Sequence, residues 1–159
     1  EDFCNGKMLP TKGKHSSDSE LATKFMPWTN LIEKLKPGDL IEFRLFFSRA
    51  NSFHSGNGMY QHWALFEGEV QGVAFVIHYS TGDSNGKLEI KRDSLEKAAG
   101  GSECRKNNSD DEFYFIHRVD LILEKARGMV KSQGYSVFRN NCEHFVHWCR
   151  YGDRKSKQV

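Results

Sequence analysis

Residues 140–151 read Asn-Asn-Cys-Glu-His-Phe-Val-His-Trp-Cys-Arg-Tyr. Asn140 followed three residues later by Glu143 is typical of a capping box, so we expect a helix from about Asn140 to Tyr151. Cys142 then falls in the first turn, where unpaired backbone N–H groups and the positive end of the helix dipole favour a thiolate. This stretch therefore predicts a helix that starts at a cysteine suited to nucleophilic chemistry.

One face of this predicted helix is apolar, and it carries Cys142, Phe145, Val146 and Cys149. The sulfur of Cys142 is therefore expected to point towards the core, at the edge of a cleft. A buried structural cysteine is the alternative interpretation, because free cysteine is among the most buried residue types. Helix geometry argues against a zinc site here. The two cysteines lie roughly 10 Å apart along the axis, and the nearby His144 and His147 lie on other faces.

Two histidines lie upstream in neighbouring predicted strands. His62 belongs to a strand over about 60–67, and His78 belongs to a strand over about 73–80. A hairpin centred near Val70 would place the two histidines directly opposite each other. Directly opposed residues share a sheet face, so the two imidazoles are expected to hydrogen-bond to each other or to a common neighbour.

The two histidines become candidate catalytic residues when they are considered together with Cys142. If the helix lies on the same sheet face, it brings the Cys142 thiol to one ring. A thiol nucleophile needs one imidazole to accept its proton and a second polar group to fix that ring's tautomer. His62 and His78 fit these two roles, although either histidine alone also fits an ordinary hydrogen-bonded residue of a sheet.

The remaining pattern predicts an α+β domain, an antiparallel sheet with segregated helices. Hydrophobic alternation and turn residues predict the elements as follows: a short helix over 27–35, a strand over 41–47, a loop over 48–58, strands over 88–91 and 113–118 separated by a weakly ordered stretch at 99–111, and a helix over 119–133.

Composition narrows the function classes. The chain has 159 residues and a mass of 18.3 kDa, which suits a single domain. The 23 Lys and Arg residues nearly balance the 21 Asp and Glu residues, which argues against nucleic acid as a partner. Four cysteines are too few for a typical secreted disulfide scaffold, so we expect a reduced, intracellular protein.

The polar residues 1–24 are expected to form a flexible lead-in, and residues 25–159 a single catalytic domain. The apolar runs are short, so none is expected to span a bilayer. The start of the chain lacks both a Met and a signal-peptide pattern, which suggests a processed or excised segment.

Several motifs together resemble the lecithin:retinol acyltransferase family, in particular its phospholipase A/acyltransferase branch, also called H-Ras-like suppressors. The motifs that carry the resemblance are Leu-Lys-Pro-Gly-Asp-Leu-Ile-Glu-Phe at 35–43, Tyr-Gln-His-Trp-Ala at 60–64, Val-Ile-His at 76–78, Asn-Cys-Glu-His-Phe-Val at 141–146 and Arg-Tyr-Gly at 150–152. The resemblance implies a circularly permuted papain-like fold, related to NlpC-type peptidases, with a Cys-His-His triad.

The resemblance also implies roles for individual residues. Cys142 would be the nucleophile, His62 the general base and later acid, and His78 the residue that orients His62. The cysteine would take an acyl chain from a glycerophospholipid as a thioester, and water, an amine or a lysolipid hydroxyl would accept it. The backbone N–H of Cys142 and the Tyr60 hydroxyl are candidate oxyanion donors. No metal or organic cofactor is implied.

Partners and location follow from the same resemblance. A monomer is expected to act on glycerophospholipid at a membrane surface, in the cytoplasm at the cytosolic face. A C-terminal hydrophobic anchor is expected beyond Val159, which would place Lys155 and Lys157 near anionic lipid.

Three other functions share the fold. A retinol acyltransferase is less favoured, because the extended insert that the resemblance implies for that member after His78 is lacking. A non-catalytic interaction module has no chemical need for His62, His78 and Cys142 together. A cysteine peptidase or amidase is a more remote alternative.

Overall fold

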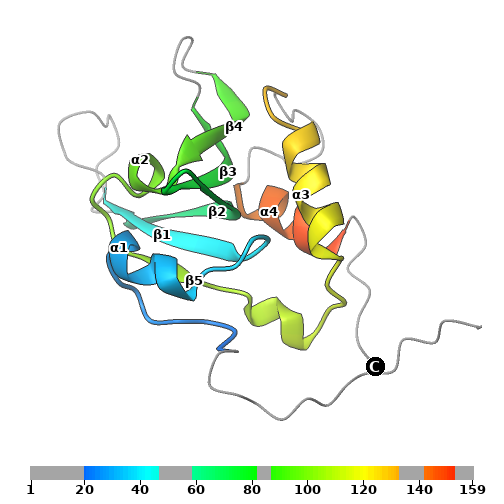
Figure 1. Ribbon diagram of the computed structural model, residues 1–159, viewed down its shortest axis with the longest axis horizontal. Coiled ribbons are helices and arrows are strands. Elements are labelled where there is room, and N and C mark those ends of the chain that lie inside the picture. Colours follow the sequence, from blue (N-terminus) through cyan, green and yellow to red (C-terminus); the bar gives the residue numbers. More distant parts are fainter. Residues whose placement is uncertain (1–19, 47–58, 82–86, 133–141, 153–159) are drawn as a thin grey trace, which may run out of the picture.

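The computed structural model describes residues 20–46, 59–81, 87–132 and 142–152, with only the backbone described for Phe46, Met59 and Tyr60 (Figure 1). These ranges hold a five-stranded antiparallel sheet in the order β4-β3-β2-β1-β5. The strands are β1 (Leu40–Phe46), β2 (Met59–Val70), β3 (Val73–Thr81), β4 (Leu88–Ser94) and β5 (Cys104–Lys106). The helices are α1 (Trp28–Leu31), η1 (Ile32–Lys34), α2 (Leu95–Ala99), η2 (Ser109–Glu112), α3 (Val119–Gly128) and α4 (Cys142–Tyr151). The expected α+β class is confirmed.

Helices cover both faces of the sheet, as Figure 1 shows, with α3 and α4 on one side and α1 and α2 on the other. Alternation along β2 divides the core between these sides. Trp63 and Leu65 pack in one buried cluster with α3 and α4 residues, whereas Ala64 and Phe66 pack in a second cluster with α1 and α2 residues. The central part of β2 is therefore apolar on both faces, and His62 is a buried polar residue on one of them.

A buried arginine ties the C-terminal end of α4 to η2 and to the turn that precedes β1. The Arg150 guanidinium donates to the carbonyl oxygen of Gly38 at 2.8 Å and to both carboxylate oxygens of Asp111 at 2.9 and 2.6 Å. The Tyr151 hydroxyl donates to the same carboxylate at 2.7 Å. A bidentate, charge-assisted pair of this kind is geometrically specific. It fixes the helix that begins at Cys142.

Two expectations about the middle of the chain are wrong. The stretch 99–111, expected to be weakly ordered, contains β5 and η2. β5 pairs with β1 through Ile41↔Lys106 and Phe43↔Cys104, but its charged sequence lacks the apolar alternation of a typical strand. Residues 113–118 form no strand within the described chain, because the alternating Phe113 and Phe115 are 57% and 58% exposed and pack in neither core cluster.

The first long helix also ends earlier than expected, at Gly128 rather than near residue 133. Two backbone hydrogen bonds explain this end. Lys131 N donates to the carbonyl oxygen of Ile90 at 2.7 Å, and Ile90 N donates to that of Ser132 at 2.9 Å. Lys131 has a φ of 70°, which turns the chain out of the helix towards β4. Gly134, which the sequence pattern predicts as the C-terminal stop of this helix, lies outside the described residues.

Ordered structure begins before the expected boundary at residue 25. Ala22 bridges to Asn107, and Met26 bridges to Cys104. Thr23 is buried, and its N–H donates to the carbonyl oxygen of Lys106 at 3.0 Å. The part of the predicted lead-in at residues 1–19 and the predicted loop at 48–58 lie outside the described residues.

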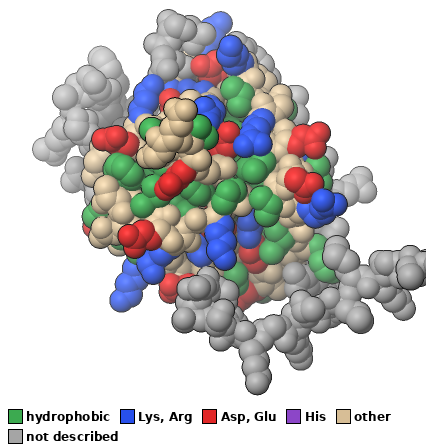
Figure 2. All heavy atoms as spheres, in the orientation of Figure 1, with side chains coloured by type: hydrophobic (Ala, Val, Ile, Leu, Met, Phe, Trp, Pro, Cys, Tyr) green, Lys and Arg blue, Asp and Glu red, His purple; other side chains and the backbone are tan. Residues whose placement is uncertain are grey.

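Charge is evenly distributed on the face drawn in Figure 2, where acidic and basic side chains are interspersed among apolar ones. This pattern matches the small formal net charge of +2. Within the described ranges, no helix combines the length and apolarity required to cross a bilayer.

Candidate active site

The β2–β3 hairpin carries both predicted histidines, but its register differs from the expected one. A hairpin centred near Val70 would pair Phe66 with Ala74, but Phe66 pairs with Val76, so the expected register is wrong by two residues. The turn is tighter than expected, because Gln71 and Gly72 alone connect the strands with φ angles of 51° and 79°. A two-residue turn with positive φ at both positions matches the twist of a hairpin.

A register shift between Phe66 and Gly68 takes up the extra residue in β2. A register predicted by pairing residues symmetrically about the turn does not include such a bulge. Continuing the observed register places Ala64, rather than His62, opposite His78. A displacement of two residues nevertheless keeps both histidines on the same face of the sheet, since strand side chains alternate with a period of two.

The two imidazoles are in direct contact, as expected. His62 Nε2 lies 2.7 Å from His78 Nδ1, within hydrogen-bond distance, and the ring centroids are 5.0 Å apart. Both side chains are buried, and the His62 ring also packs against Phe43, its cross-strand partner on β1. Diagonal neighbours on adjacent strands are within reach of ring-sized side chains, which explains the contact.

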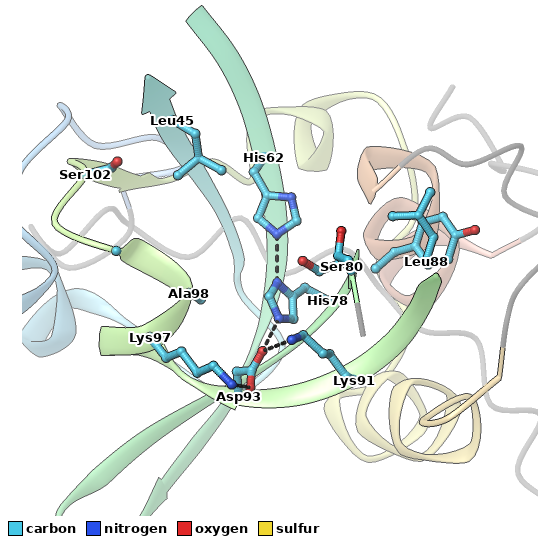
Figure 3. A pocket seen from close by; sticks show the side chains of 13 residues that line it. Leu45, His62, His78, Ser80, Leu88, Lys91, Asp93, Lys97, Ala98 and Ser102 are labelled. Atoms are coloured by element: carbon cyan, nitrogen blue, oxygen red, sulfur yellow. Dashed lines mark hydrogen bonds and ion pairs between the residues drawn. The ribbon is translucent and has the colours of Figure 1, made fainter. Parts of the chain in front are cut away.

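Asp93 on β4 is a third member of this chain of contacts, and it was not predicted from the sequence. His78 Nε2 lies 2.8 Å from Asp93 Oδ2, so the three side chains form a continuous line from His62 to Asp93 (Figure 3). Asp93 is only 9% exposed. The predicted strand stopped at Lys91, whereas β4 continues to Ser94, and a longer strand would have placed this carboxylate on the histidine face.

Burial and charge set the protonation of this line. Burial, followed by the proximity of His78, lowers the pKa of His62 to about 3. The hydrogen bond from His78, followed by Lys91, holds the pKa of Asp93 well below its usual range, against the opposing effect of burial. At neutral pH His62 is therefore an uncharged imidazole, and Asp93 is a carboxylate.

Acid is therefore expected to destabilise the fold through His62. Unfolded His62 takes up a proton near pH 6.5, whereas the buried ring resists protonation down to about pH 3. The free energy of unfolding should fall as pH decreases through that window, by at most about 1.4 kcal/mol per pH unit. Asp93 adds a further loss only below its unfolded value of 3.8.

Urea denaturation of the wild type and of His62→Asn at several pH values between neutral and about pH 4 measures this effect. The pH dependence should be weaker in the variant, and the comparison cancels the contribution of His117, whose pKa burial also lowers. Equal pH dependence in the two proteins would contradict the assignment.

Cys142 is the first residue of α4 and is 6% exposed. Phe145, Val146 and Cys149 share its buried face, as expected. The helix itself lies against the Trp63 face of the sheet, not against the histidine face, so the expectation of a shared face is wrong. Trp63 follows His62 directly, and consecutive side chains of a strand point to opposite faces.

The thiol meets β2 at its backbone. Cys142 Sγ lies 4.0 Å from the carbonyl oxygen of Gln61, the residue that precedes His62. The helix start and the imidazole line thus converge on neighbouring residues of one strand. Burial raises the pKa of Cys104 and of Cys149 to about 12, which makes these two thiols poor nucleophiles. Within the described ranges, Cys104, Cys142 and Cys149 form no disulfide with one another.

A cavity of about 570 Å³ opens beside the imidazole line. Figure 3 shows that His62 and His78 border it from β2 and β3, with Asp93 at its base and Lys97 on α2 at its side. Leu45 and Leu88 add apolar surface to the lining. The cavity therefore combines polar and apolar surface next to the two rings.

The structure does not test the expected roles of the Tyr60 hydroxyl and the Asn140 cap, nor the expectation that no metal is needed. The Tyr60 side chain and the predicted cap Asn140 lie outside the described residues, so the Tyr60 hydroxyl stays a prediction. In the portions of the chain that are described, no three His, Cys, Asp or Glu side chains are placed together to hold a metal ion.

The fold and the site define an α+β domain in which a helix-start cysteine and a buried His-His-Asp line meet the same strand. Residues 33–155 match the model of the lecithin retinol acyltransferase family. The chain belongs to this family, in agreement with the resemblance noted from its motifs.

Named relatives agree with this assignment. Phospholipase A and acyltransferase 4 of Homo sapiens is 38% identical over 138 residues, which cover 78% of this chain and 74% of the relative. Phospholipase A and acyltransferase 1 of Homo sapiens is 32% identical over 132 residues, which cover 77% and 71%. Phospholipase A and acyltransferase 5 of Rattus norvegicus is 30% identical over 167 residues, which cover 98% of this chain but 54% of that relative.

Proposed function

We propose that this protein is a thiol-dependent phospholipid hydrolase and acyltransferase, with Cys142 as nucleophile and His62 as general base. One observation carries the proposal. His62 contacts His78, and the Cys142 thiol approaches the carbonyl oxygen of Gln61, the residue next to His62 on β2. The family membership, and relatives named phospholipase A and acyltransferase, support a lipid ester as the substrate.

In the first half-reaction, the Cys142 Sγ–H bond breaks and its proton moves to Nδ1 of His62. The thiolate sulfur attacks the ester carbonyl carbon of a glycerophospholipid, and the carbonyl electron pair moves onto oxygen. The backbone N–H of Cys142 and the Tyr60 hydroxyl are the proposed donors to that oxyanion. Collapse breaks the C–O bond, and His62 returns the proton to the lysophospholipid oxygen, which leaves an acyl thioester on Cys142.

In the second half-reaction, an acceptor removes the acyl group. His62 takes a proton from water, an amine or a lysolipid hydroxyl as the acceptor attacks the thioester carbonyl. The C–S bond then breaks, and the proton passes to the Cys142 sulfur. Water yields a free fatty acid, and the other acceptors yield acylated products. This two-step order is typical of covalent catalysis.

The protonation of His62 favours a general-base mechanism over a resting thiolate–imidazolium pair. A ring whose pKa is lowered to about 3 is uncharged before the reaction, so it offers a lone pair to the thiol proton, but it is a weak base. Burial makes the resulting imidazolium costly, so the neighbouring groups must stabilise it in the transition state. The proposed site of action is the surface of a membrane on its cytosolic side, where the acyl donor resides.

A substrate panel tests this function. The protein is incubated with vesicles of phosphatidylcholine and phosphatidylethanolamine that carry different acyl chains at the two positions, and the products are identified by mass spectrometry. We expect fatty acid and lysophospholipid, together with N-acylated phosphatidylethanolamine where the amine accepts the chain. Retinol and acyl-peptide arms test the retinol acyltransferase and the peptidase or amidase alternatives. Products in those arms alone would contradict the proposal, and no product in any arm would favour an interaction module.

A further inference from the structure

The carboxylate of Asp93 is held at the junction of β4 and α2 by three donors. His78 Nε2 lies at 2.8 Å, Lys91 Nζ at 3.2 Å and Lys97 Nζ at 3.3 Å. Lys91 is two residues earlier on the same strand, and Lys97 is one turn further along, on α2. Ser94 caps α2 by accepting a hydrogen bond from Lys97 N at 3.1 Å, so the element that presents Lys97 is itself fixed. Asp93 thus has little freedom to rotate.

A carboxylate offers only acceptors, and this property determines which ring nitrogens carry hydrogen. Facing Asp93, His78 Nε2 must carry a hydrogen and donate it. In the neutral ring Nδ1 of His78 is then an acceptor, and His62 Nε2, 2.7 Å away, must donate to it. The remaining nitrogen of His62, Nδ1, then holds a lone pair. This is the form of His62 that can accept a proton from a thiol.

We propose that Asp93 is a positioning residue of the active site, which through His78 holds His62 in the tautomer that accepts a proton at Nδ1. This inference rests on the proposed function, in which His62 is the base for Cys142. It extends the expected Cys-His-His set by a fourth side chain that acts at a distance of two hydrogen bonds from the base.

Asp93 also supplies charge behind the two rings. When His62 takes up the thiol proton, its buried ring becomes positive, and the nearest carboxylate along the line is Asp93. No proton has to reach Asp93 for this stabilisation, because the carboxylate acts through its charge and its hydrogen bond to His78. Lys91 and Lys97 hold the carboxylate in place, and the hydrogen bond from His78 and the charge of Lys91 keep it ionised.

The alternative is that Asp93 only ties α2 to the sheet through Lys97. A structural role of that kind would change stability but would leave the tautomers of the two rings and the turnover rate of the folded enzyme unaltered. The Asp93→Asn substitution separates the two roles, because it keeps the size of the side chain and removes its charge and its acceptor-only character. Glu96→Gln, an exposed carboxyl on the first turn of α2, is the matched control.

The first readout is the histidine tautomer, measured by long-range ¹⁵N–¹H NMR of the imidazole rings. In the wild type we expect hydrogen on Nε2 of both His62 and His78. In Asp93→Asn we expect a population with hydrogen on Nδ1 of one or both rings. Hydrogen on Nδ1 of His62 in the wild type would overturn the proposal, and this measurement does not depend on the stability of any variant.

The second readout is lipid turnover. For Asp93→Asn we expect kcat to fall about 10- to 100-fold, as activity does when the carboxylate that orients a metal-bound histidine is lost. KM should change by less than about twofold, because Asp93 acts on the base rather than on substrate binding. Glu96→Gln should match the wild type. Unchanged kcat in a folded Asp93→Asn protein, or wild-type tautomers in that variant, would overturn the proposal.

The two claims can fail separately. If the wild type shows no acyl transfer, or if Cys142→Ala retains it, the proposed function is wrong. The tautomer measurement still tests whether Asp93 orders the two rings. If transfer depends on Cys142 and His62 but not on Asp93, only the positioning role is wrong.

Discussion

Replacing Cys142 with alanine is expected to lower the rate of fatty-acid release from phosphatidylcholine vesicles by at least about a thousandfold. Loss of the nucleophile removes the covalent route altogether and leaves only the contributions of binding and oxyanion stabilisation. The thiol is almost fully buried, but alanine is smaller than cysteine and fits the same position at the start of α4. Release of labelled fatty acid under initial-rate conditions measures the effect.

Cys149→Ala is the matched control for this substitution. Cys149 lies on the same buried face of α4, so the two substitutions remove equal volumes from one core cluster. Burial raises the pKa of its thiol to about 12, and the mechanism gives it no role. We expect the activity of Cys149→Ala to stay within a few-fold of the wild type. Equal losses of activity in the two variants would indicate that Cys142→Ala acts by disturbing the packing of α4 and not by removing the nucleophile.

Replacing His62 with asparagine is expected to lower turnover by about a thousandfold, within the range measured for general bases. Alkylation of Cys142 by iodoacetamide near neutral pH should slow as well, because the proton acceptor of the thiol is lost. Asparagine is chosen because it is smaller than histidine and still offers a polar group to His78. Turnover and alkylation rates, measured on the same preparations, test both consequences.

His144→Asn is the control, because His144 lies on the exposed side of α4, two residues from Cys142. It should retain wild-type turnover. The wild-type pH profile offers a further check. Since the pKa of His62 in the protein without substrate is lowered to about 3, kcat/KM should show no decline with a midpoint near the ordinary histidine value of 6.5. A wild-type decline at that pH that disappears in His62→Asn would contradict a base that is uncharged at rest.

Sequence patterns located the main parts of the site without placing them fully. The cysteine at the start of α4 and the contact of His62 with His78 were both expected. The contact survived a wrong register because the shift was even, and only an odd shift would have moved one ring to the other face. The shift itself came from a two-residue turn and a bulge after Phe66, which pairwise symmetry along a hairpin does not reveal.

Features that depend on long-range pairing were the hardest to predict. β5 is short and charged, and it is a strand because it pairs with β1 on one side and bridges to Met26 on the other. Asp93 was missed because it is an acidic residue in a polar stretch, and its importance follows from pairing with β3. The expected placement of α4 on the histidine face failed because Trp63, next to His62, packs against that helix instead. The side-chain position of Tyr60 stays a prediction.

The proposed mechanism requires a covalent acyl group on the Cys142 sulfur, and trapping this acyl-enzyme is its most direct test. The wild-type protein is mixed with phospholipid vesicles, quenched with acid within the first turnovers, digested and examined by mass spectrometry. We predict that the peptide containing Cys142 carries one acyl chain, which neutral hydroxylamine removes, and that the Cys142→Ala protein carries none. Lipid turnover with an unmodified Cys142 peptide, or with the acyl group on another residue, would contradict the account.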